Sequence, residues 1–171
     1  MFSKIIRIAL SLGLFVWSIY NFIDGEIGNG IALLFPTTLV LFSYFRNERI
    51  LWSLYHMRKQ NLDKAEKVLL GIKNPEKSLI KTQLAYYYLL MGMIESQRKV
   101  GKAETLLKKA LNTGLRMDQD KALAKLNLAG IALSKRRKKE AQILLTDVKR
   151  LDSKGVLAEQ TKYIKQQMKK I

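Results

Sequence analysis

The sequence predicts an all-α protein, with two transmembrane helices followed by an α-solenoid of about three helix pairs plus a C-terminal capping helix. Three observations lead to this prediction. Two apolar runs lie close to the N-terminus, a helical pattern recurs downstream at a fixed spacing, and charge is divided unevenly between these parts. The first 45 residues carry two cations and two anions, so the whole net charge of +17 lies in residues 46–171.

The N-terminal part is interpreted as a helical hairpin in a membrane. Residues 5–23 form an apolar run with one charge, and residues 27–45 form a second run with none. Each run has 19 residues, close to the roughly 20 that a helix needs to cross a bilayer. A short acidic turn separates them. A cleaved signal peptide followed by a core helix is the weaker alternative, because no small-x-small cleavage site precedes the turn.

Flanking cations set the predicted orientation of this hairpin. Its open end carries Lys4, Arg7, Arg46 and Arg49, whereas its turn carries only acids. The positive-inside rule then places both termini in the cytoplasm. The sequence therefore predicts an integral protein of a bacterial inner (plasma) membrane, with a transmembrane hairpin over residues 1–45 and a cytoplasmic helical repeat domain over residues 46–171.

Residues 46–171 contain an internal repeat. Three segments align without gaps: KAEKVLLGI from Lys64, KAETLLKKA from Lys102 and EAQILLTDV from Glu140. Their alanines lie 38 residues apart, and an apolar run with helical spacing precedes each segment. Breakers such as Asn74-Pro75 fall between the units. A single helix pair cannot bury its apolar face alone, so the units are expected to stack on one another.

These units resemble the tetratricopeptide repeat family. The best-matched residues are the alanines that enter the second helices, Ala65, Ala103 and Ala141. The resemblance covers roughly residues 48–171 and departs from the family pattern in the middle unit, where Gly92 comes one position late. The spacing of 38 is also longer than the family's usual one. The resemblance implies stacked helix pairs that bind peptides or helices of other proteins, and a generic helical bundle is the alternative.

The resemblance also implies a concave groove lined by the first helix of each pair. Three consecutive tyrosines point in different directions on a helix, so at least one packs into the stack while the others can line the groove. Gly92 and Gly130 would allow close backbone approach. Simple packing between first helices is the alternative role of the tyrosines. The expected groove residues are Ile50, Leu54, Tyr86, Tyr88 and Leu126.

Five consecutive cations, residues 135–139, fall in the turn of the third unit. The corresponding turns of the first two units are basic too, so three corners of one sign would stack into a positive ridge. The expected contact residues of this ridge are Arg136, Arg137, Lys138 and Lys139. The ridge is either a solvated corner, a contact for an acidic protein or anionic lipid, or a nonspecific contact for nucleic acid.

No catalytic, cofactor or metal site is expected. The chain has no cysteine and a single histidine, His56, and it shows neither a glycine-rich phosphate loop nor a nucleophile motif. The predicted function is a membrane-anchored, non-enzymatic scaffold that binds a protein partner at the membrane surface. Two alternatives remain open: an accessory subunit of a membrane transport or secretion complex, and a basic tether for ribosomes or nucleic acid.

Overall fold

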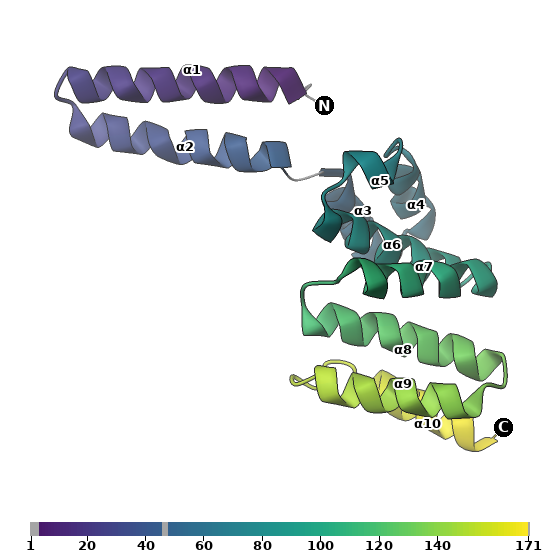
Figure 1. Cartoon of the computed structure of the whole chain (residues 1–171). Helices are drawn as coiled ribbons and strands as arrows, with labels where there is room; N and C mark the ends of the chain where they lie inside the picture. The colour runs from purple at the N-terminus through teal and green to yellow at the C-terminus, as the bar shows by residue number, and fades with distance from the viewer. Residues whose placement is uncertain (1–3, 46–47, 171) are drawn as a thin grey trace. The chain divides into compact units, whose positions relative to one another are not determined.

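The computed structural model describes residues 4–45 and 48–170, and these contain ten α-helices and no strand (Figure 1). The expectation of an all-helical chain is thereby confirmed. The chain divides into two compact units, Met1–Glu48 and Arg49–Ile171, and each is described by itself. Of the cations that flank the predicted hairpin, Arg46 lies outside the described residues, as do the side chains of Lys4 and Arg7.

The first unit is a pair of helices, α1 (Lys4–Ile23) and α2 (Ile27–Phe45), joined by a turn in which Gly25 takes a positive φ of 82°. Polar side chains lie in the interface between the two helices. Ser18 is fully buried and donates a hydrogen bond of 2.7 Å from Oγ to the carbonyl oxygen of Gly30. A hydroxyl buried in this way requires such a partner. Ser11 and Thr37 are buried as well.

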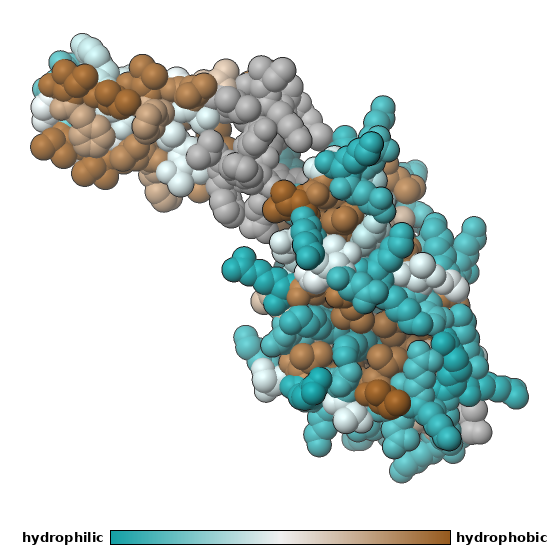
Figure 2. All heavy atoms as spheres, viewed as in Figure 1, coloured by the Kyte–Doolittle hydropathy of each residue, from teal (hydrophilic) through white to brown (hydrophobic). Residues whose placement is uncertain are grey.

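Large apolar side chains occupy the outer surface of this pair. Figure 2 shows the result as a largely brown surface over α1 and α2, whereas the surface of the second unit is mostly teal. Exposed apolar area on this scale is unusual for the surface of a monomeric soluble protein. Among the most exposed side chains are Leu12, Val16, Trp17, Ile31 and Phe35.

The prediction of two transmembrane helices is wrong, and so is the assignment to a bacterial inner membrane. Within residues 4–45 and 48–170, no helix is both long enough and apolar enough to cross a bilayer. The physical reason is the polar content of the two runs. α1 has two cations near its start and Asn21 near its end, and α2 opens with Gly28, Asn29 and Gly30. These groups shorten the continuous apolar stretch below the roughly 20 residues that a span requires.

The second unit contains the remaining helices. α6 and α7 form one close pair and α8 and α9 another; α6 packs on α4, α8 packs on α7, and α10 covers the last pair. Most of these contacts join helices that are adjacent or one apart along the chain, which is compatible with a helical repeat. The bounds are α3 (Glu48–Arg58), α4 (Leu62–Leu70), α5 (Pro75–Ser78), α6 (Lys81–Glu95), α7 (Val100–Thr113), α8 (Asp118–Ser134), α9 (Lys138–Leu151) and α10 (Ala158–Lys170).

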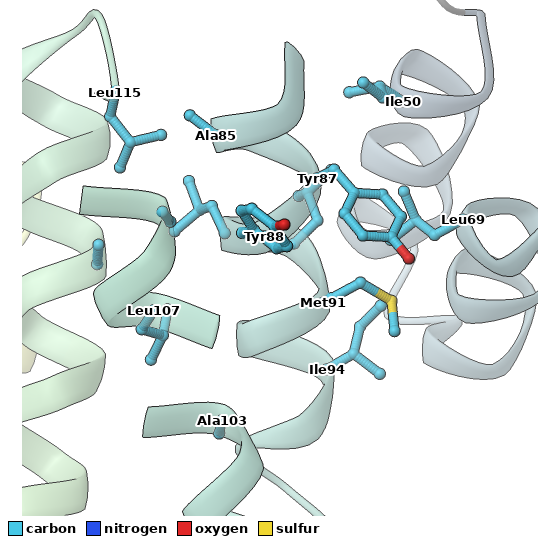
Figure 3. Close-up of a cluster of buried hydrophobic side chains, with 14 of the residues drawn as sticks. Ile50, Leu69, Ala85, Tyr87, Tyr88, Met91, Ile94, Ala103, Leu107 and Leu115 are labelled. Atoms are coloured by element: carbon cyan, nitrogen blue, oxygen red, sulfur yellow. The ribbon is translucent and has the colours of Figure 1, made fainter. Parts of the chain in front are cut away.

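The core of the second unit repeats with the sequence. Each second helix buries a stripe at spacing i, i+4 and i+7, which is one face of an α-helix. All nine stripe residues are buried, and Figure 3 shows Ala103 and Leu107 of one stripe beside α6. The stripes are Ala65 and Leu69 in α4 with Ile72 just after its end, Ala103, Leu107 and Ala110 in α7, and Ala141, Leu145 and Val148 in α9.

Two of the corners between paired helices share one backbone geometry. Gln60 and Arg136 lie two repeat periods apart, and both adopt a left-handed φ, 57° and 58°. At the second corner the Arg136 amide donates to the Leu133 carbonyl at 2.9 Å, and the next amide donates to the Ala132 carbonyl at 2.8 Å. This pair of bonds is the Schellman arrangement that ends helices. The corners are therefore defined turns, although α5, which begins at Pro75, is a helix where only a break was expected.

Candidate functional site

A candidate site in the second unit is a groove of about 480 Å³ between α6, α8 and α10. It lies on the side of the first helices, with the capping helix as its far wall. Its volume is within the range of ligand-binding clefts. The lining consists of Met93, Ser96, Val100, Leu123, Leu126, Asn127, Gly130, Ile131, Ser134, Gln160 and Ile164.

α8 supplies the groove with a stripe of its own. Leu123, Asn127, Gly130 and Ser134 follow one another at i, i+4, i+7 and i+11, so a single helix face presents all four. Asn127 donates from its amide to the Leu123 carbonyl at 2.9 Å, which fixes the side chain against the helix. An amide retains a second hydrogen and an acceptor oxygen for a ligand. The floor is aliphatic and the rim carries hydroxyl and amide groups, and no lining residue is charged.

The two glycines singled out from the sequence differ in their surroundings. A Cβ built on Gly92 of α6 would lie 2.8 Å from Cγ of Leu107 and 3.2 Å from the Leu107 backbone nitrogen. Gly92 therefore permits the close approach of α6 and α7. A Cβ on Gly130 would meet only the tip of Ile164, at 4.0 Å. Gly130 leaves an opening in the groove wall and is not needed for helix packing.

The structure places four of the five expected groove residues in or against one buried cluster, not in the groove. Ile50, Tyr88 and Leu126 occupy the same repeat position, 38 residues apart, and all three are buried. Of the expected set, only Leu126 lines the groove. Leu54 is half-buried against the core, and Tyr86 is half-buried in the same cluster.

The tyrosines act as hydrogen-bond donors that tie α6 to acidic residues. The Tyr86 hydroxyl donates to Asp120 in the first turn of α8, and the Tyr88 hydroxyl donates to Glu76 of α5 at 2.7 Å. Burial, followed by these bonds to carboxylates, raises the pKa of each tyrosine from 10.0 to about 12. Lys109 places its ammonium 5.4 Å from the centre of the Tyr88 ring. Both tyrosines are thus structural.

The pKa of Tyr88 predicts a loss of stability in alkali. A tyrosine whose folded pKa is raised contributes stability that is complete below the unfolded value of 10.0 and is lost as pH rises toward about 12. Tyr88→Phe removes the hydroxyl, so the variant should be less stable than the wild type at pH 8 by about 0.5–1.5 kcal/mol. Urea unfolding at a series of pH values should show this gap narrowing above pH 10. Exposed Tyr163 provides the control, because Tyr163→Phe should follow the wild type throughout.

The predicted basic ridge divides into paired and unpaired cations. Arg137 is a junction residue: its guanidinium binds Glu104 of α7 at 2.7 Å and Glu140 of α9 at 2.8 Å. Lys135 and Lys108 bind the same Glu104 carboxylate. Hydrogen bonds from Arg137 first, then from Lys108 and Lys135, hold the pKa of Glu104 well below its usual range. The Glu104 carboxylate therefore stays ionised and joins the third repeat (α8 and α9) to the second repeat (α6 and α7).

The same junction occurs one repeat earlier. Arg98, in the corner of the second repeat (α6 and α7), binds Glu66 and Asp63 of α4 in the first repeat. Glu66 and Glu104 lie one period apart, directly after the repeated alanines. This recurring pair was missed from the sequence, although the repeated Ala-Glu dipeptide was its signal.

Three ridge residues remain exposed: Arg136, Lys138 and Lys139. The described residues offer no carboxylate within ion-pair distance of any of them. That they contact lipid, protein or RNA stays a prediction. Lys125, near the groove, pairs instead with Asp147 of α9.

Within residues 4–45 and 48–170, no three His, Asp or Glu side chains are placed to hold a metal ion. His56 is half-buried on α3 beside Tyr55, with ring centres 5.6 Å apart.

No family model, no curated protein and no solved structure matches the chain. A function for this protein therefore rests on the geometry of the site.

Proposed function

We propose that the second unit is a non-enzymatic, tetratricopeptide-like scaffold that holds a segment of a partner protein in the groove between α6, α8 and α10. The observation that carries the proposal is the lining, which combines an aliphatic floor with an uncharged hydroxyl and amide rim. General acid–base catalysis needs a titratable group at the site, and this groove supplies none. An apolar face of a peptide or helix fits such a floor, while amides and hydroxyls bind its polar edge.

The stacking of helix pairs supports this function. Helices fixed by buried stripes and by the Arg98 and Arg137 junctions form a rigid wall, so the groove is formed before a partner arrives. A groove formed in advance lowers the entropy cost of binding. The resemblance to tetratricopeptide repeats, carried by Ala65, Ala103 and Ala141, supports the same use.

Filling the groove should abolish partner binding without unfolding the protein. Gly130→Phe projects a ring into the open space toward Ile164, and Gly101→Phe places the same ring on an exposed site outside the groove. A photo-crosslinking phenylalanine analogue at Gln160, on the rim, would be introduced into the wild type and both variants in native cells. We expect one adduct of defined mass in the wild type and in Gly101→Phe, and loss of that adduct in Gly130→Phe.

Circular dichroism of the three proteins serves as the folding control for this experiment. If Gly130→Phe retains the helical signal and the adduct persists at wild-type yield, the groove is not the binding site. Absence of any adduct from the wild type would equally contradict the proposal.

A further inference from the structure

The first helix of the stack, α3, carries exposed aromatic side chains on one face. Trp52 is 58% exposed and Tyr55 46% exposed, and their rings meet edge to face with centres 6.0 Å apart. The opposite face of the same helix is packed, since Ile50 and Ser53 are buried. Large aromatic residues exposed together are typical of binding surfaces, where they supply much of the affinity.

The repeat shows what this face normally contacts. Trp52 occupies the position of Leu90 in α6 and Leu128 in α8, which are only 2% and 4% exposed. Leu128 belongs to a buried cluster with Leu107 of α7, which is the second helix of the preceding repeat. Tyr55 likewise corresponds to Ile131, a member of the same cluster. The exposed face of α3 therefore corresponds to the face by which the first helix of each later repeat packs on the second helix of the repeat before it.

The covering helices of the later units have a common chemistry. α4 lies on α6 and α7 lies on α8, and both contain Ala-Glu-x-x-Leu, at residues 65–69 and 103–107. In each, the alanine and leucine are buried and the glutamate binds an arginine at the corner of the following unit. A helix that covers α3 in the same manner would present a small residue, a leucine four positions later, and an acid between them.

The charges beside the face agree with an acidic occupant. Arg58 and Lys59 are exposed at the corner that follows α3, and the Lys59 ammonium lies 4.6 Å from the centre of the Tyr55 ring. In the described part of the chain neither forms an ion pair with a carboxylate. A second copy of this chain would bring another +17 of charge toward the same corner, and such repulsion disfavours self-association.

We propose that Trp52 and Tyr55 form the docking surface for an acidic amphipathic helix of a partner protein, which occupies the place of a preceding second helix. This surface is separate from the α6–α8–α10 groove, so the inference goes beyond the proposed scaffold function. Its partner helix takes the pattern Ala-Glu-x-x-Leu with further acids on its solvent side. The aromatic rings pack on the alanine and leucine, and Arg58 and Lys59 pair with the acids.

The chain itself provides a probe for this surface. The probe is a hydrocarbon-stapled, fluorescein-labelled peptide of residues 100–113 with Lys108→Glu and Lys109→Glu, stapled on the side opposite the stripe of Ala103 and Leu107. The staple is needed because a free helix of this length is marginal in water. Fluorescence anisotropy with the full chain should show saturable binding. Trp52→Ser should weaken it by about tenfold or more, and Ile143→Ser, at an equally exposed apolar site on α9, should leave it unchanged.

A second variant, in which the charges of Arg58 and Lys59 are reversed, tests the docking surface even if Trp52→Ser fails to fold. Arg58→Glu with Lys59→Glu should weaken binding of the acidic peptide and strengthen binding of a peptide that carries Glu104→Lys and keeps its native lysines. Gly130→Phe should bind both peptides as the wild type does, which separates this surface from the groove. Failure of the wild type to bind, or equal binding by Trp52→Ser, would overturn the proposal. So would a Trp52-dependent dimer in sedimentation equilibrium, which would identify a second copy as the occupant.

Discussion

Replacing Gly92 by alanine is expected to lower the free energy of unfolding by about 1–3 kcal/mol, the usual cost of overpacking. The added methyl group would lie 2.8 Å from Cγ of Leu107, 3.0 Å from its Cδ2 and 3.2 Å from its backbone nitrogen. The leucine is fully buried, so its side chain has little room to rotate away. The backbone contact requires α7 itself to shift. Urea unfolding followed by far-UV circular dichroism measures the loss.

Gly130→Ala is the matched control for this change. Both glycines lie within first helices, and alanine has the higher helix propensity by about 1 kcal/mol. At Gly130 the new methyl group would meet only Ile164 Cδ1, at 4.0 Å, so nothing offsets that gain. We therefore expect opposite signs: Gly92→Ala loses stability and Gly130→Ala gains it. Equal effects at the two sites would show that the close approach of α6 and α7 has been misjudged.

The repeat in the second unit could be predicted because its signals are local. The stripe of Ala103, Leu107 and Ala110 follows helical spacing within one helix, and the 38-residue period carries that stripe to the other units. Burial of the apolar face then follows from the need to cover it. The start of α8 carries a local signal as well, since Asp118 and Asp120 lie in its first turn. Favourable interaction with the helix dipole explains their placement.

The groove could not be predicted because it depends on the rotation of each first helix about its own axis. One residue corresponds to about 100° of rotation, so Asn127 and Leu128 point in very different directions although they are neighbours: Asn127 lines the groove and Leu128 is buried in the core. Which of them faces the groove is set by packing on helices far along the chain, including α10. The ion pairs at Arg98 and Arg137 depend on the same long-range packing, because each joins two units across more than thirty residues.

The membrane prediction fails for a different reason. Average hydropathy treats the two N-terminal runs as uniform, whereas polar groups occur at defined places in them. Ser18 bonds to the backbone of the facing helix, and Thr37 bonds to the Leu33 carbonyl in its own helix. Backbone carbonyls of the pair thus satisfy both hydroxyls, and no helix in the described residues meets the length and apolarity of a span. Composition alone could not show which side chains face the interface between α1 and α2.

Ala103→Phe is expected to destabilise the stack by about 1–3 kcal/mol or more, because a benzyl group must enter a site at which the methyl group is completely buried. Ala103 precedes Leu107 on the stripe of α7 that packs into the main core, as Figure 3 shows. Since Ala141 holds the same repeat position and is equally buried, Ala141→Phe should cost a similar amount. Ala158→Phe, at an exposed alanine in the first turn of α10, should change stability little. Thermal unfolding of the three variants compares the sites directly, and an unchanged melting curve for Ala103→Phe would contradict the stacking of units through these alanines.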